Sequence, residues 1–246
     1  MAVSVDKVYQ KVLAIANKEQ RGYITPQEFN LFADHAQMDI FEQYFYDLEQ
    51  RQKRGTGNES DYADIVTNIE EKISIFELYN QSVGNTNAGI VYISSNVTNF
   101  YRLGTVHINY NDGTSNIAEQ IQINELNKYK NSPLATWTKS RPVYSKFSTN
   151  ADPVTIQVYP DIDITSVSVS CVKRPNAPNW TYLIGSNKNA LYNPNAADHK
   201  HFELHSSEET NLVVKILQLA GIAIKDFNLV QAAAQEEVKS IQLEKQ

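Results

Sequence analysis

Cysteine is nearly absent from this chain of 246 residues, which contains Cys171 and no other. A single cysteine cannot form an internal disulfide and cannot build a cysteine-rich metal site. Cys171 ends a run, begun at Val167, in which apolar and polar residues alternate. Because such alternation is typical of a half-buried strand, we expect the Cys171 thiol to fill part of a core.

Glycine and proline are scarce, with 9 and 8 residues, whereas 41 % of the residues are hydrophobic. This composition excludes collagen-like, low-complexity and wholly disordered chains. An excess of positive charge is also absent, since 22 Lys and Arg stand against 28 Asp and Glu and give a formal net charge of -6. The chain therefore lacks the basic field with which a dedicated DNA-binding protein gathers phosphates.

Long apolar runs are missing as well. No stretch reaches the ~20 apolar residues that span a bilayer, and the first residues do not form a basic head followed by an apolar segment. The sequence also lacks the G-x-S-x-G nucleophile elbow, the Walker loop and the Rossmann glycine motif. We therefore expect no membrane insertion, no catalytic residues, no cofactor and no enzymatic activity.

Two helices are predicted at the beginning of the chain. Apolar residues recur every three or four positions from Ser4 and predict a helix over about 4–17. Thr25-Pro26-Gln27-Glu28 combines an N-cap threonine, a proline at the first helical position and a capping-box glutamate. It begins a second helix whose apolar and aromatic stripe continues to Leu48. The first helix can cover about half of this stripe, so the other half requires another partner, either within the chain or outside it.

The end of the chain is predicted to be helical too. Ser206-Ser207-Glu208-Glu209 forms a second S-x-x-E capping box before an apolar stripe that reaches Ala220. Gly221 is expected to interrupt this helix, and Asp226 is expected to cap a closing one. Neighbouring carboxylates such as Glu208 and Glu209 diverge on a helix, so we expect them to be solvated.

Between the helical ends the pattern changes to that of β structure. The polar segment 52–61 is predicted to be a loop, and the change from helix to strand is placed near Lys72. Alternation over 89–174 predicts a mostly antiparallel β domain with a hairpin turn at 111–114. The alternating runs are 91–93, 106–110, 121–123, 156–158 and 167–171. The expected fold is α+β, with a helical hairpin over 1–57, a β-rich domain over 58–185 and a C-terminal helical segment over 186–246.

Two segments have features of metal sites. Residues 17–28 have the length of a calcium loop, but Arg21 stands at its fifth position, where an oxygen ligand is required. Residues 198–205 contain three of the five histidines, and an extended backbone would place four zinc ligands on one side. These candidates are His199, His201, Glu203 and His205. We favour the alternative in which Phe202 and Leu204 point inward and the polar side chains form a solvated rim, and we expect no metal.

Three regions resemble structural proteins of tailed phages. Residues 5–48 resemble the N-terminal helical hairpin of such proteins, and residues 201–220 match the same group. The β region is similar to that of head-to-tail adaptor and tail ring proteins. The motifs of this chain that carry the similarity follow in the order Tyr101-Arg102-Leu103, Arg141-Pro142-Val143-Tyr144, Ile156-Gln157-Val158-Tyr159-Pro160 and Lys173-Arg174-Pro175.

This resemblance implies a virion protein of the neck or tail, assembled in the host cytoplasm, of the kind found in short-tailed phages, including crAss-like ones. It implies a homo-oligomeric ring that connects the portal to the tail, has other neck and tail proteins as partners and forms part of the DNA passage. Because acidic residues repel the DNA phosphates, an acidic chain would keep the wall of the passage from binding DNA. The alternative is a tail-attached β module that binds host-surface glycans, with Trp137 and Trp180 as stacking platforms.

Overall fold

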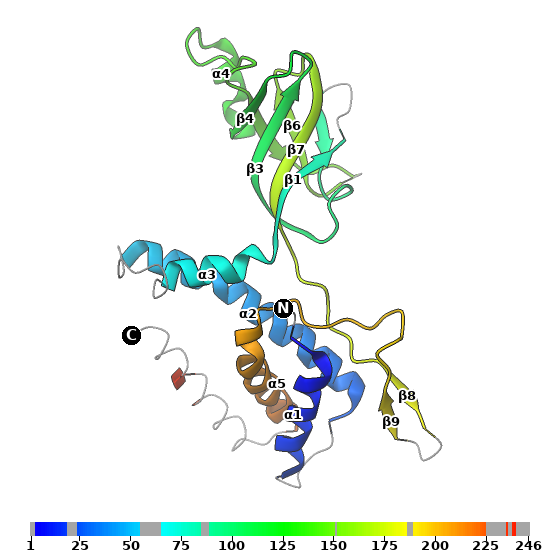
Figure 1. The fold of residues 1–246 in the computed structure, drawn as a ribbon. Helices are drawn as coiled ribbons and strands as arrows, with labels where there is room; N and C mark the ends of the chain where they lie inside the picture. The colour runs from blue at the N-terminus through cyan, green and yellow to red at the C-terminus, as the bar shows by residue number, and fades with distance from the viewer. Residues whose placement is uncertain are drawn as a thin grey trace. The chain divides into compact units, whose positions relative to one another are not determined.

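The computed structural model describes residues 3–18, 24–54, 65–84, 89–150, 152–185 and 189–224, together with residues 235, 238 and 239 (Figure 1). The fold is α+β, as expected. One compact unit contains Met1–Ile75 and Pro175–Gln246, and the other contains Phe76–Arg174. This grouping differs from the expected segments 1–57, 58–185 and 186–246, because the two ends of the chain share one unit. None of the described helices is long and apolar enough to cross a membrane.

The first unit contains the two predicted N-terminal helices, α1 (Val5–Lys18) and α2 (Pro26–Arg54). The capping box before α2 is confirmed. The Thr25 N–H donates to Glu28 Oε2 at 2.9 Å, and the Glu28 N–H donates to Thr25 Oγ1 at 3.3 Å. Residues 52–54 continue α2, so the loop predicted to begin at residue 52 is wrong there. Residues 55–61 of that loop lie outside the described residues.

The inner face of α2 is covered within the chain. Helix α5 (Glu209–Ile224) packs on α2 and on α1, and α3 (Ile65–Ser74) packs on α2 as well. The helices therefore supply the partner that the long aromatic stripe requires. The largest side chains of this core are almost completely buried, and they include Phe29, Phe41, Phe202, Leu212 and Ile216.

The start of α5 differs from the prediction. A 3₁₀ turn, η2 (Ser206–Glu208), precedes it, and the His205 side chain accepts the Ser207 N–H at 3.3 Å. The cap is thus His205, in place of the predicted box at Ser206. Gly221 lies inside α5, so the predicted interruption is also wrong. Burial of its apolar neighbours offsets the roughly 1 kcal/mol that glycine costs in a helix. Asp226 and most of the predicted closing helix lie outside the described residues.

Glu208 corrects another prediction, because its side chain is buried and not solvated. Lys72 Nζ lies 2.6 Å from Glu208 Oε1, and Asn211 Nδ2 donates to Glu208 Oε2 at 2.8 Å. The Lys72 ammonium also lies 5.7 Å from the centre of the Tyr44 ring. The ion pair and its contacts with Tyr44 and Asn211 therefore link α3, α2 and the start of α5.

We predict that Lys72→Met destabilises the helical unit by roughly 3 kcal/mol, because it leaves the Glu208 carboxylate buried without its cation. The double variant Lys72→Met/Glu208→Gln should be less destabilised than Lys72→Met alone, since the uncompensated charge is gone. Urea unfolding followed by circular dichroism measures both. Equal stability of Lys72→Met and the wild type would contradict the role of the pair.

The second unit contains one curled sheet of seven strands, in the order β1-β7-β3-β4-β5-β6-β2. Its strands are β1 (Glu77–Val83), β2 (Ile90–Tyr92), β3 (Phe100–Tyr110), β4 (Ser115–Gln120), β5 (Val143–Phe147), β6 (Thr155–Tyr159) and β7 (Ile164–Lys173). All neighbours are antiparallel except β4 and β5, which are parallel. Strands from both halves share one core, which includes Val91, Val106, Ile156 and Val169. Cys171 is 4 % exposed in this core, which confirms its predicted place.

Several local predictions in this unit can be compared with the structure. The change from helix to strand falls between Ser74 and Glu77, close to the predicted position at Lys72. The strand expected at 121–123 is wrong. The chain leaves the sheet after Gln120, forms η1 (Ile123–Glu125) and continues into α4 (Leu126–Asn131). Two alternating isoleucines are too short a pattern to distinguish a strand from a turn.

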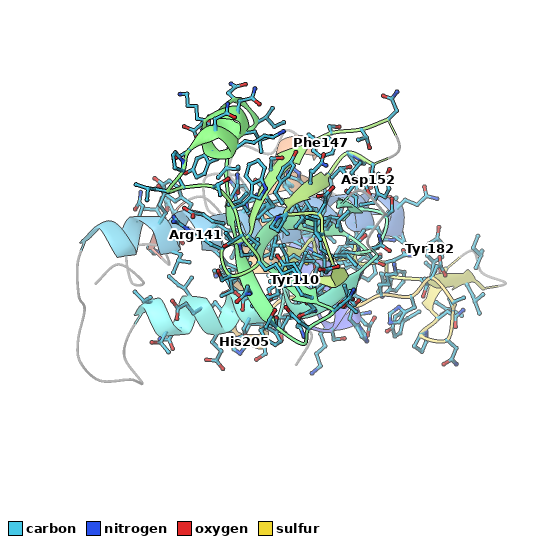
Figure 2. All side chains as sticks on the ribbon, turned by 90° about the horizontal axis from the view of Figure 1, so that it is seen from above. Tyr110, Arg141, Phe147, Asp152, Tyr182 and His205 are labelled. Atoms are coloured by element: carbon cyan, nitrogen blue, oxygen red, sulfur yellow. The ribbon has the colours of Figure 1, made fainter. Side chains whose placement is uncertain are left out.

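The loop around Asp152 (labelled in Figure 2) joins two parts of the β unit. Asp152 is fully buried, and its carboxylate accepts the Ser95 N–H at 2.7 Å, the Ser95 hydroxyl at 2.8 Å and the Val154 N–H at 2.8 Å. Burial by itself raises the pKa of Asp152, but these hydrogen bonds together lower it below the usual 3.8. The loop is therefore held by an ionised carboxylate.

We predict that Asp152→Asn destabilises the β unit by about 2 kcal/mol near pH 7, because the amide cannot accept all three hydrogen bonds. Since the folded pKa is lowered, the stabilisation by Asp152 is present above the unfolded pKa of about 3.8 and is lost as the pH falls through the folded value. Unfolding in urea near pH 7 and near pH 3 should show the gap between variant and wild type narrowing in acid. A gap that is independent of pH would contradict this assignment.

Candidate interaction surfaces

The histidine-rich segment does not assemble the zinc ligands that an extended backbone allows. The His201 Nδ1 accepts the Val5 N–H at 3.3 Å, the Glu203 carboxylate accepts Asn176 Nδ2 at 2.6 Å, and His205 caps η2. His199 faces another side chain, with its Nε2 3.2 Å from the Tyr192 hydroxyl. Phe202 and Leu204 are buried, which confirms the interpretation with the apolar side chains inward.

Partial desolvation lowers the pKa of His201, and the neighbouring His199 lowers it further. The lowered pKa favours the neutral ring that can accept the Val5 N–H. In the described parts of the chain, no group of three His, Cys, Asp or Glu side chains is placed to hold a metal ion. Residues 19–23 of the calcium-like segment lie outside the described residues, and Glu28 at its end belongs to the capping box.

Trp180, a candidate stacking platform of the glycan-binding alternative, lies in the helical unit and is only 2 % exposed, so its ring is not available to stack on a glycan. Its indole N–H donates to Asp6 Oδ1 at 2.9 Å, and its backbone N–H donates to Asn30 Oδ1 at 2.9 Å. Its ring is surrounded by other rings, with centroid distances of 4.3 Å to Tyr9, 5.8 Å to Tyr182 and 5.7 Å to Tyr192. Trp180 thus anchors neighbouring elements to α1 and α2.

The elements anchored by Trp180 form a hairpin, β8 (Tyr182–Ile184) and β9 (Ala190–Tyr192). Tyr182 pairs with Tyr192 at its base, beside Trp180. Farther along, Leu183, Ile184 and Leu191 are 61 %, 74 % and 57 % exposed. We call these three residues the hairpin surface. Figure 1 shows the hairpin extending away from α1 and α2.

A second surface follows the outer side of α2. Its exposed residues recur every three or four positions and form one line along the helix. This outer stripe contains Glu28, Leu31, His35, Asp39, Glu42, Tyr46 and Glu49. Leu31 is 72 % exposed and Tyr46 is 58 % exposed. Four of its seven residues are Asp or Glu and none is Lys or Arg, so the stripe is acidic.

A third surface is the crossover arm, residues 121–142, which joins the parallel strands β4 and β5 and contains η1 and α4. Neither η1 nor α4 contains a buried residue. Leu134 is 94 % exposed in the turn after α4, and Ile123 is 51 % exposed. The arm contains four Lys and Arg and one acidic residue, Glu125, so it is basic within an acidic protein.

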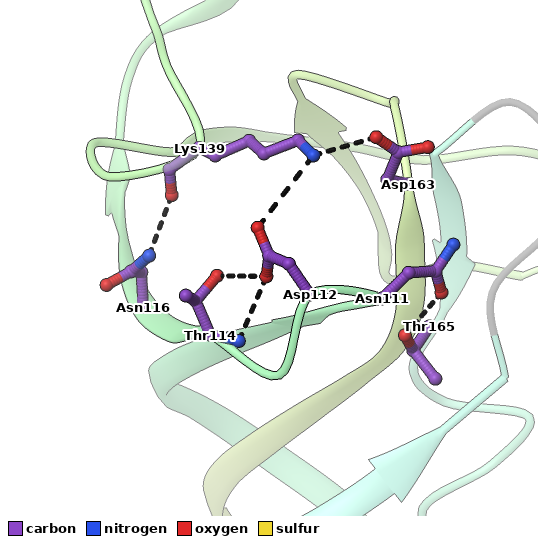
Figure 3. A network of polar contacts seen from close by, with 7 residues as sticks. All are labelled: Asn111, Asp112, Thr114, Asn116, Lys139, Asp163 and Thr165. Atoms are coloured by element: carbon purple, nitrogen blue, oxygen red, sulfur yellow. Dashed lines mark hydrogen bonds and ion pairs between the residues drawn. The ribbon is translucent and has the colours of Figure 1, made fainter.

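The basic residues of the arm fall into two groups. Where the arm returns to the sheet, Lys139 Nζ lies 2.7 Å from Asp163 Oδ2 and 3.9 Å from Asp112 Oδ2 (Figure 3). The hydrogen bond to Asp163 is the main reason that the pKa of Lys139 is raised. Arg141 faces Glu119 at 3.8 Å. Lys128 and Lys130, by contrast, are exposed on α4 and have no ion pair with any described residue.

The same network confirms the predicted hairpin turn at 111–114. The Gly113 N–H donates to the Tyr110 carbonyl at 3.0 Å, and Gly113 has a positive φ of 82° that suits glycine. Thr114 donates its hydroxyl and its N–H to Asp112 Oδ1, and these bonds lower the pKa of Asp112. Asn116 Nδ2 donates to the Lys139 carbonyl at 2.8 Å, which ties the arm to β4.

Trp137, the other candidate platform of the glycan-binding alternative, lies in the arm and is half-buried. Its ring packs against Tyr159, with 4.8 Å between the ring centroids. One face of this indole is therefore occupied by a neighbouring strand.

In comparisons with known proteins, no protein family and no curated protein matches the chain.

We predict that substitutions at the buried base of the hairpin and at its exposed surface have different effects on the stability of the helical unit. Trp180→Ala should destabilise the helical unit by about 3–5 kcal/mol, because it removes a buried indole and leaves Asp6 without its donor. The double variant Leu183→Ser/Ile184→Ser should stay within about 0.5 kcal/mol of wild type, since both side chains are exposed. Thermal unfolding measures both. A strong loss of stability in the serine variant would show that the hairpin surface belongs to the core.

Proposed function

We propose that this protein is a virion structural protein that forms a homo-oligomeric ring in the neck or tail of a short-tailed phage. In this role it connects the portal to the tail and surrounds part of the DNA passage. The observation that carries the proposal is that three separate elements present large exposed apolar side chains: the hairpin surface, the outer stripe and the crossover arm. Exposed apolar groups rimmed by polar residues are typical of protein–protein contacts.

Several surfaces on one subunit suit a ring. Each subunit of a cyclic ring uses two different faces, one toward each neighbour, because a head-to-tail contact is heterologous. A subunit of a neck or tail also contacts the rings before and after it, which requires further surfaces. The resemblance of residues 5–48, 101–175 and 201–220 to phage adaptor and ring proteins supports the same role.

The environment of the buried Cys171 thiol favours a structural role for this residue over a catalytic one. Burial raises the pKa of the Cys171 thiol, which disfavours the reactive thiolate. The formal net charge of -6 suits a wall along which DNA passes without being held. The glycan-binding alternative has lost one of its two platforms, since Trp180 is buried among other rings.

The proposal is tested by mass photometry and negative-stain microscopy of the full chain, both alone and mixed with isolated phage portal complexes. We expect particles whose mass is a multiple of 27.9 kDa and whose images show a closed ring with a central hole. The Leu183→Ser/Ile184→Ser variant provides a matched protein for asking whether the hairpin surface takes part. A protein that stays monomeric in both arms would contradict the ring, and selective binding to a glycan array by that monomer would favour the alternative.

A further inference from the structure

We propose that the crossover arm of one copy docks on the outer stripe of α2 in a second copy. This inference rests on the proposed ring and identifies the contact between its neighbouring subunits. The arm is residues 121–142, and the stripe is the exposed line from Glu28 to Glu49. The occupant of each surface is therefore another molecule of the same chain.

The first argument is charge complementarity. On the arm, Lys139 and Arg141 already face acidic residues of the same chain, which leaves Lys128 and Lys130. Four of the seven stripe residues are Asp or Glu, and none is Lys or Arg. Lys128 and Lys130 are exposed and make no ion pair with any described residue. On the stripe, Glu42 is exposed, and Asp39 faces the His35 imidazole at 3.9 Å. Opposite charges on two faces steer association and fix its register.

The second argument is that each charged surface also has apolar anchors. Leu134 is 94 % exposed on the arm, and Leu31 and Tyr46 are 72 % and 58 % exposed on the stripe. Acidic residues lie one helical turn from each anchor: Glu28 precedes Leu31 by three positions, and Glu42 precedes Tyr46 by four. Leu31 and Tyr46 stand about 22 Å apart along the helix, at ~1.5 Å per residue. Apolar anchors within a polar rim are the usual anatomy of an interface.

The third argument is the structure of the arm itself. Helix α4 has six residues and buries none of them. So short a helix is marginal in water, because nucleation costs more than one turn of hydrogen bonds returns. A partner surface that covers Leu134 and pairs with either Lys128 or Lys130 would stabilise it. The hairpin surface is a weaker candidate for this contact, because its three exposed residues carry no charge.

The contact is heterologous, since the arm and the stripe are different surfaces. Each copy would offer its arm to one neighbour and its stripe to the other. Such contacts propagate, and they close into a ring when the rotation between neighbours divides a full turn.

Charge reversal tests the contact. We compare an arm-reversed chain, Lys128→Glu/Lys130→Glu, with a stripe-reversed chain, Asp39→Lys/Glu42→Lys. Both lysines are changed because residues two apart lie on different sides of a helix. Each reversal should raise the dissociation constant for self-association at least about tenfold in low salt. Sedimentation velocity measures association, and circular dichroism verifies folding. Glu70→Lys/Glu71→Lys has the same charge change as the stripe reversal on exposed residues of α3, and it should not weaken association.

Mixing provides the decisive comparison. An equimolar mixture of the two reversed chains contains unaltered arms and unaltered stripes on different molecules. It should therefore associate with a dissociation constant close to that of wild type. The wild-type association should also weaken from about 50 mM to about 500 mM NaCl, because exposed charge pairs are screened. Leu134→Ser should weaken association without loss of stability, since its side chain is 94 % exposed.

The possible outcomes distinguish a failure of the proposed contact from a failure of the proposed ring. A wild-type ring that both reversals leave unchanged would overturn this contact and leave the proposed function standing. Charge-dependent dimers or open filaments without closed rings would support the contact and contradict the ring. A mixture that fails to associate, or a wild type that does not self-associate, would overturn the contact between copies.

Discussion

The helical unit depends on the covering of α2 by elements that lie far away in the sequence. A helix of 29 residues with a stripe of aromatic side chains is not stable in water by itself, so its inner face must be buried. Helix α5, from the other end of the chain, covers much of it, and Trp180 and Phe202 complete the core. The fully buried Gln37 fixes this arrangement. Its Nε2 donates to the Asn176 carbonyl at 2.7 Å, and its Oε1 accepts the Glu203 N–H at 3.0 Å.

The pairing of the two chain ends explains why the β unit is an insertion. Residues 76–174 leave the helical unit after Ile75 and return to it at Pro175. The ends of the insertion are fastened within the β unit, where the Lys173 N–H donates to the Phe76 carbonyl at 2.9 Å. Inside, the shared core and the buried Asp152 join the strands, so the crossover arm contributes no buried residue from η1 or α4. The arm is therefore free to serve contacts with other molecules.

The proposed ring follows from what these two cores leave exposed. Because α2 is buried on its inner side by its own chain, its acidic outer stripe faces solvent, with Leu31 and Tyr46 among the charges. The parallel pairing of β4 and β5 requires a crossover, and this crossover is basic and presents the 94 % exposed Leu134 in the turn after α4. Two complementary surfaces of one chain are what a cyclic assembly requires.

The sequence by itself determined the features that depend on near neighbours: α1, the capping box of Thr25 and Glu28, the turn at 111–114, and the alternating strands around Cys171. Periodicity and capping act within a few residues, so a linear pattern carries them. The tertiary structure decided which polar and aromatic side chains are buried. Glu208 is buried beside Lys72, Trp180 is covered by Tyr9 and Asp6, and His201 accepts the Val5 N–H. Those partners lie up to 196 positions away, and no local pattern specifies them.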